Sequence, residues 1–318
     1  MIRRLTSTLH ASDILIISFL GILSLINLAF CGRIPSWWLM IVINVVAVSA
    51  ILGLGDLRHR TGSKILRLIH EWYLAPAVLF SFKELYFMIK PIHGGKDYDA
   101  LLIGIDRWMF GVNPTEWLMR FANPYLTEIL QLAYTLFYFL FLVIGYELYR
   151  RRDPDAFHAF MFTCVYGFFL SYIGYLFLPA VGPRFTLHDF PSLDQDLPGV
   201  LITPYLRWFV NWGESVPLGV SNAVAMAGAQ RDVFPSGHTM MMLVMITLSA
   251  RYRLKVRYFI YVTGALLIIA TVYERYHYVV DLIAGTCFMI VTVLTAPRLY
   301  EGMKRRFQTL ESRFPRNP

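Results

Sequence analysis

Long runs of apolar residues with few charges divide this chain. They lie at about 12–31, 36–54, 71–90, 127–148, 157–178, 237–250, 258–273 and 279–297. About 18 or more consecutive apolar residues suffice for a helix to cross a bilayer. A soluble protein with deeply buried helices would instead show apolar stripes at helical spacing, which these runs lack. We therefore expect an all-α, polytopic membrane helical bundle with about six to eight transmembrane helices.

The basic residues give the direction in which the chain crosses the membrane. Only 16% of residues are charged, but the net charge is +8. Most Lys and Arg residues gather at alternate ends of the apolar runs. These clusters are Arg3 and Arg4, residues 58–67, Arg150 to Arg152, residues 251–257 and the tail from Arg298. Basic loops stay in the cytoplasm, so both termini are expected there. The charge orients the chain and indicates no nucleic acid partner.

We expect one integral membrane domain over residues 1–318. Its parts are N-terminal helices at about 12–92, an amphipathic outer segment at about 93–124, a catalytic core at about 125–297 and a basic cytoplasmic tail at 298–318. The outer segment is too polar to span the bilayer and is typical of an interfacial helix. A second outer loop, at about 180–235, carries aromatic residues typical of the membrane–water interface. These are Tyr205, Trp208, Phe209 and Trp212.

The cysteines indicate neither a disulfide framework nor a metal site. Cys31, Cys164 and Cys287 lie in or beside apolar runs, without the spacing of metal ligands. Two charged residues, Lys83 and Glu84, fall inside an apolar run, where charges are costly and need partners. Adjacent residues of a helix do not face each other. Each therefore needs another partner, either in a structural polar network or at a substrate cavity.

Three polar motifs are predicted to lie at the outer membrane face. They are Gly182-Pro183-Arg184-Phe185, Phe234-Pro235-Ser236-Gly237-His238-Thr239 and the segment from Tyr273 to Asp281. The topology follows from basic residues outside these motifs, yet it places all three on the same side. A lone histidine near a membrane surface is often structural. The convergence of several polar groups on one face instead indicates a site.

The second motif is suited to binding an anion. Pro235 can open a helix because its missing N–H would be unpaired there. Ser236 and Gly237 then offer free N–H groups at the positive end of the helix dipole. His238, on the first turn, could donate a proton to a leaving oxygen.

The third motif is suited to nucleophilic attack. His277 and Asp281 are four residues apart and share one face of a helix. The carboxylate could fix the tautomer of the imidazole and leave the other ring nitrogen free to attack phosphorus. A carboxylate about one turn inside a span is costly and requires such a partner. Arg184 offers a planar fork that fits two phosphate oxygens.

These motifs resemble those of the type 2 phosphatidic acid phosphatase superfamily. Phe-Pro-Ser-Gly-His-Thr, followed about forty residues later by His-Tyr-Val-Val-Asp, is similar to its second and third motifs. The resemblance implies a helical membrane core, no metal, no cofactor and a phosphohistidine intermediate. It implies His277 as nucleophile, Asp281 as its orienting carboxylate and His238 as general acid. It also implies Ser236 and the Gly237 backbone as phosphate ligands.

The chain departs from the family pattern at two cationic positions. Phe177 stands where the first motif has a lysine, and Thr271 where the third has an arginine. Arg275 lies two residues before His277 and is a further candidate phosphate ligand. It would need a different backbone path to reach the phosphate. The Gly-Pro-Arg-Phe form, the Ile-Asp-Arg-Trp-Met-Phe-Gly segment and His-Tyr-Val-Val-Asp resemble the inositolphosphotransferase branch. That branch includes inositol phosphorylceramide synthases, and sphingomyelin synthases are similar at the second and third motifs.

Together these features predict a metal-independent membrane enzyme acting on a phospholipid, sphingolipid or polyprenyl phosphate. The expected reaction is headgroup transfer through a phosphohistidine, because fewer cations suit a phosphodiester. One alternative is a simple lipid phosphate phosphatase acting on phosphatidate, phosphatidylglycerophosphate or polyprenyl phosphate. Another is a transporter or channel with a degenerate site. The expected location is the bacterial inner membrane or another cellular membrane, with the site on the periplasmic or lumenal face.

Overall fold

The protein is helical throughout the part that the structure describes. This computed structural model describes residues 8–313, and side chains as far as Arg306, with no strand among them. Arg3, Arg4 and Arg316, as well as the side chain of Arg313, lie outside the described residues. The expected all-α membrane bundle is confirmed.

Six segments are long and apolar enough to cross a membrane. They are α2 (Ala11–Ala29), α3 (Trp37–Thr61), α4 with α5 (Lys64–Ile92), α8 (Pro124–Arg150), α9 (Pro154–Phe177) and the Val279–Arg306 part of α16 (Val279–Arg313). The other two predicted runs form shorter helices, α14 (Gly237–Arg251) and α15 (Arg257–Tyr273), of which α15 is apolar. The protein is therefore an integral membrane protein.

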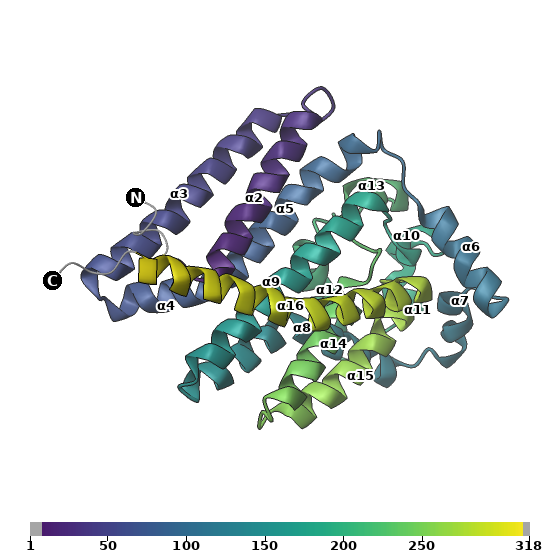
Figure 1. Cartoon of the computed structure of the whole chain (residues 1–318). Helices are drawn as coiled ribbons and strands as arrows, with labels where there is room; N and C mark the ends of the chain where they lie inside the picture. The colour runs from purple at the N-terminus through teal and green to yellow at the C-terminus, as the bar shows by residue number, and fades with distance from the viewer. Residues whose placement is uncertain (1–7, 314–318) are drawn as a thin grey trace. The chain divides into compact units, whose positions relative to one another are not determined.

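The chain separates into two compact units. The first contains the residues up to Gly95, residues 157–169 and the residues from Thr292 onward. Within it, α2 and α3 pack side by side (Figure 1), and α4 (Lys64–Trp72) leads into α5 (Leu74–Ile92).

Glu84 joins three helices of the first unit. Its Oε1 accepts hydrogen bonds from the amides of Asn27 on α2 and Asn44 on α3, each at 2.9 Å. All three side chains are buried. A charged group inside a membrane span needs such partners, and Glu84 therefore belongs to a structural polar network.

The second unit contains residues 96–156 and 170–291, and it holds all the predicted site residues. Here α8 packs against both α14 and α15, and α14 lies beside α15 (Figure 1). The remaining helices are short: α6 (Asp99–Phe110), α7 (Pro114–Leu118), α10 (Pro183–Thr186), α11 (Leu193–Asp196), α12 (Thr203–Gly213) and α13 (Asn222–Gly228), with 3₁₀ turns at Met119–Phe121 and Phe190–Ser192.

Side-chain caps mark the starts of α8 and α9. Asn123 accepts the N–H groups of Tyr125 and Leu126 before Pro124 opens α8. A capped proline start suits both the fixed φ of proline and its missing donor. The same arrangement, with Asp153 as the cap, begins α9 at Pro154.

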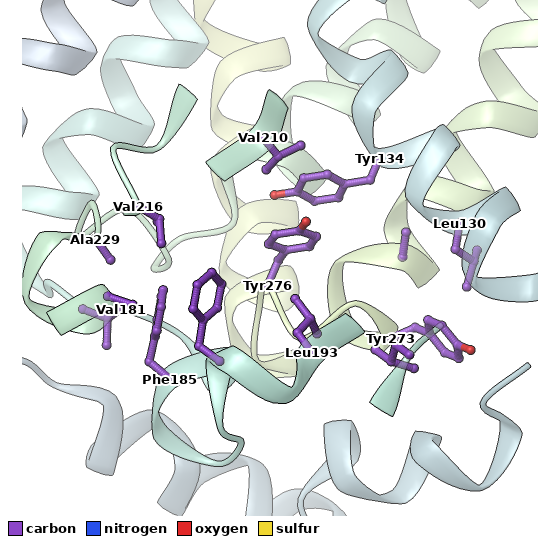
Figure 2. Close-up of a cluster of buried hydrophobic side chains, with 14 residues drawn as sticks. Leu130, Tyr134, Val181, Phe185, Leu193, Val210, Val216, Ala229, Tyr273 and Tyr276 are labelled. Atoms are coloured by element: carbon purple, nitrogen blue, oxygen red, sulfur yellow. The ribbon is translucent and has the colours of Figure 1, made fainter. Parts of the chain in front are cut away.

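The core of the second unit is rich in aromatic side chains. Figure 2 shows the rings of Tyr134 on α8 and Tyr276 lying face to face, with centroids 4.1 Å apart and planes inclined by 11°. On α12, Phe209 packs against Tyr138, whereas Tyr205, Trp208 and Trp212 are exposed. Their role as a membrane-interface anchor stays a prediction.

Candidate active site

The second motif forms the start of α14 and docks on the start of α16. Ser236 is the N-cap of α14, and its Oγ accepts the N–H of Thr239 at 3.2 Å. The backbone N–H of Ser236 donates to the carbonyl oxygen of Asp281 at 2.9 Å. A Cβ at Gly237 would meet the hydroxyl of Tyr175. The close packing therefore fixes His238 relative to the first turn of α16.

His277 is held through one ring nitrogen. Its Nδ1 lies 3.0 Å from the carbonyl oxygen of Val233 and 3.5 Å from Oδ2 of Asp281. Since a carbonyl can only accept, Nδ1 must carry the proton, which leaves Nε2 with a lone pair. Burial lowers the pKa of His277 to about 3, although the Val233 bond acts in the opposite direction. The ring is therefore neutral near pH 7, as a nucleophile must be.

Asp281 has a second task besides facing His277. The same Oδ2 accepts the backbone N–H of Tyr278 at 2.8 Å. The carboxylate thus holds the turn that leads into α16 while lying beside the Nδ1 of His277. A negative charge at this place would stabilise the positive imidazole formed when Nε2 attacks phosphorus.

His238 is enclosed by aromatic rings next to His277. Its ring stacks on Tyr134, with centroids 4.5 Å apart, and also lies 4.5 Å from the ring of Phe137. The centroids of His238 and His277 are 5.8 Å apart. Within the described residues, Nε2 of His238 is buried and makes no hydrogen bond. That nitrogen is thus available to exchange a proton with a substrate.

Arg184 approaches the histidines from a tightly bent loop. At Gly182 φ is +97°, and a Cβ there would lie 2.9 Å from the carbonyl oxygen of Tyr276, so the bend requires glycine. The buried guanidinium of Arg184 forms an ion pair with Glu214 and lies 5.0 Å from the ring centroid of Tyr276. A second nitrogen donates to Asn211 at 3.2 Å.

These groups line one small cavity. Its walls are Tyr134, Arg184, Glu214, Asp232, Val233, His238, Tyr276 and His277. The cavity has a volume of about 10 Å³, which is room for about one water molecule. The two carboxylates of the wall, Glu214 and Asp232, were not predicted from the sequence.

The remaining predicted ligands lie outside this cavity wall. Ser236, Gly237 and Asp281 lie behind it, at the starts of α14 and α16. The guanidinium of Arg275 forms an ion pair with Asp196 at 2.8 Å and contacts the sulfur of Met119. Its side chain is therefore not brought to His277.

The two departures from the family pattern also lie away from the cavity. Phe177 is the last residue of α9 and is 75% exposed. Thr271 is buried, and its hydroxyl donates to the carbonyl oxygen of Ile268 at 2.7 Å. Neither side chain lines the wall, and neither could replace a cation.

Sequence reasoning missed two carboxylates on α6 that hold the site loops. Asp99 accepts the N–H groups of Val181 and Gly182 at 3.1 and 2.8 Å, and the Tyr278 hydroxyl at 2.8 Å. Asp106 accepts the N–H groups at the start of α16. The two acids are seven residues apart, the spacing of one helix face, and this was the available signal.

One known protein family matches the part of the chain that holds the cavity. Residues 100–295, more than half of the chain, match the model of the PAP2 superfamily. The chain belongs to the PAP2 superfamily. The matched region runs from α6 into α16 and contains every residue of the cavity wall. No curated protein and no solved structure matches the chain. Membership indicates activity of the phosphatase or phosphotransferase type on lipid phosphates.

Proposed function

We propose that this PAP2 superfamily member is a lipid phosphotransferase that moves a phosphate-linked headgroup through a phosphohistidine at His277. The observation that carries the proposal is the pair of imidazoles in one cavity wall, with centroids 5.8 Å apart. The Nδ1 of His277 is engaged by the Val233 carbonyl, so Nε2 is the nitrogen left for phosphorus. Nε2 of His238 has no hydrogen-bond partner among the described residues.

The reaction would take place in two steps. In the first, Nε2 of His277 forms a bond to phosphorus while the P–O bond to the leaving alcohol breaks, and protonated His238 gives that oxygen its proton. In the second, the hydroxyl of an acceptor attacks phosphorus and passes its proton back to His238. The N–P bond then breaks, and both histidines regain their starting states.

The charge of the cavity favours a phosphodiester donor. Among the described residues, Arg184 is the one arginine in the cavity wall, and Phe177 and Thr271 bring no cation to it. A phosphate monoester carries about 1.5 to 2 negative charges at pH 7, whereas a phosphodiester carries one. The substrates we propose are a phospholipid donor and a lipid alcohol acceptor, as in inositol phosphorylceramide synthases. The proposed location of the site is the outer face, with both termini in the cytoplasm.

Trapping the intermediate tests the proposal. Purified protein would be mixed with a phospholipid that carries ³²P in its phosphodiester, and the reaction would be stopped with alkali, in which phosphohistidine survives. We expect label on His277 and a new labelled phosphodiester when an alcohol is present. Both should be lost in His277→Ala.

His188→Ala is the matched control. His188 lies in the loop that also carries Arg184 but outside the cavity wall, and its Nε2 lies 3.1 Å from the Thr115 hydroxyl. This variant should label normally. Release of free phosphate with no new diester would favour a simple lipid phosphatase. Transport in liposomes without lipid turnover, activity in His277→Ala, or strict dependence on a divalent metal would contradict the proposal.

A further inference from the structure

Glu214 is the ion-pair partner of Arg184, the arginine of the cavity wall. We propose that Glu214 is a specificity-determining residue, which makes the site prefer a singly charged phosphodiester to a doubly charged phosphate monoester. This inference rests on the proposed function, since it concerns the substrate of the same site. It adds a residue that neither the motifs nor the family match assigns.

The contacts of Arg184 show how its charge is already engaged. One terminal nitrogen pairs with Glu214 and the other donates to Asn211, while the remaining guanidinium nitrogen, Nε, has no partner in the described part of the chain. The side chains of Arg184 and Glu214 are only 6% and 7% exposed. Water screens such a buried pair weakly, so a substrate phosphate meets a neutral pair rather than a free cation.

The other arginines that the structure describes near the site are already paired with carboxylates. Arg207 pairs with Glu274 at 2.8 Å, and Arg275 pairs with Asp196 at 2.8 Å. Neither guanidinium belongs to the cavity wall, which instead contains a second carboxylate, that of Asp232. A second negative charge on the substrate would therefore face carboxylates without a second arginine to balance it.

The position of Glu214 in its helix also links it to Arg184. Glu214 is the C-cap of α12, and its N–H donates to the carbonyl oxygen of Val210. A carboxylate at the negative end of a helix dipole is unfavourable, so the arrangement depends on the nearby guanidinium. A purely structural ion pair would affect both substrate classes equally, which makes the two roles separable.

The test compares two lipids that differ in one phosphate charge. Release of diacylglycerol would be measured from phosphatidate and from its methyl diester, phosphatidylmethanol, in wild type and Glu214→Gln. The glutamine keeps the shape and can still accept a hydrogen bond from Arg184, but it removes the negative charge. We expect wild type to have a higher kcat/KM for the diester than for the monoester. In the variant this ratio should fall about tenfold, because turnover of the monoester becomes faster. An unchanged kcat/KM ratio would overturn the inference.

Asp196→Asn is the matched control, because it removes the carboxylate from Arg275, outside the cavity wall. It should leave the ratio of the two substrates unchanged. An equal shift in this variant would show a general effect of net charge and would also overturn the role of Glu214.

A measurement on wild type covers the case in which Glu214→Gln does not fold. The second ionisation of a phosphate monoester has a pKa of about 6, whereas the diester does not titrate there. The preference for the diester should therefore narrow as the pH falls from 8 to 5. A preference that is absent, or independent of pH, contradicts the role of Glu214. Failure of the proposed function looks different, because wild type would then form no phosphohistidine at His277 from either lipid.

Discussion

One carboxylate oxygen of Asp106 lies 2.8 Å from the backbone nitrogen of Val279, two residues after His277. The other oxygen accepts the N–H of Val280 at 2.9 Å. Free N–H groups at the start of a helix form the positive end of its dipole, and a carboxylate satisfies them well. Through this bond, α6 sets the direction in which α16 leaves the site, and with it the placement of His277.

Asp106→Ala should damage the site as well as the helix start. Loss of a side chain that caps a helix costs about 0.5–2 kcal/mol of stability. We expect kcat to fall by about tenfold or more, because a nucleophile displaced by a fraction of an ångström attacks poorly, while KM changes little. Thermal unfolding and lipid turnover of the purified variant would measure the two effects.

Asp153→Ala separates capping from positioning. Asp153 caps α9 by accepting the N–H of Ala156 at 3.0 Å, and it is not part of the cavity wall. A comparable loss of stability with normal kcat is expected there. Equal losses of kcat in both variants would mean that α6 has no particular role in placing His277.

Much of the fold was predictable from the sequence, because bilayer spans require long apolar runs. All eight predicted runs are helices. The starts of α8 and α9 follow from Asn123 and Asp153, each of which precedes a proline and caps the helix. Six are long enough to span by length and composition. At 15 and 17 residues, α14 and α15 are shorter than the typical span of about 20 residues, because apolar runs in the sequence do not fix where a helix begins and ends.

The candidate site was predictable only in part. The sequence predicted that His238, His277 and Asp281 share one site. His277 and Asp281 are one helical turn apart, and the predicted topology places both histidine motifs on the same membrane face. The partners of arginines depend on tertiary packing and leave no local pattern. Arg275 was therefore a reasonable phosphate ligand in the sequence, yet its guanidinium pairs with Asp196. For the same reason Glu214, thirty residues from Arg184, gave no signal.

Asp281→Asn should reduce the chemical step more than substrate binding. The asparagine amide can still accept a hydrogen bond from the N–H of Tyr278. The substitution removes the negative charge that lies 3.5 Å from Nδ1 of His277. The positive imidazole of the intermediate would lose its stabilising partner. We expect kcat to fall by about 10²–10⁴-fold with a nearly constant KM. A fall confined to KM would show that Asp281 acts on binding instead.

The rate of phosphohistidine formation should not fall between pH 8 and pH 5. A histidine attacks phosphorus only when neutral, and burial lowers the pKa of His277 to about 3 from its ordinary value of 6.5. As the pH falls from 8 to 5, the nucleophile therefore stays unprotonated, and protonation removes it only near pH 3. Single-turnover labelling with a phosphodiester lipid, whose phosphate does not titrate in this range, would measure the rate. A decline centred near pH 6.5 would contradict a buried, neutral His277.

Gly285→Ala should separate the two helices that carry the histidine motifs. A Cβ at Gly285 on α16 would lie 2.6 Å from the carbonyl oxygen of Ser236, a backbone atom at the start of α14. A backbone atom cannot avoid the clash by a change of side-chain rotamer. We therefore expect α14 to shift and kcat to fall by about tenfold or more. Gly302→Ala is the control on the same helix, because nothing lies within 4 Å of the added carbon. It should keep full activity and gain up to about 1 kcal/mol in stability. Lipid turnover and thermal unfolding of both variants decide the matter, and normal kcat in Gly285→Ala would contradict a fixed spacing between the histidines.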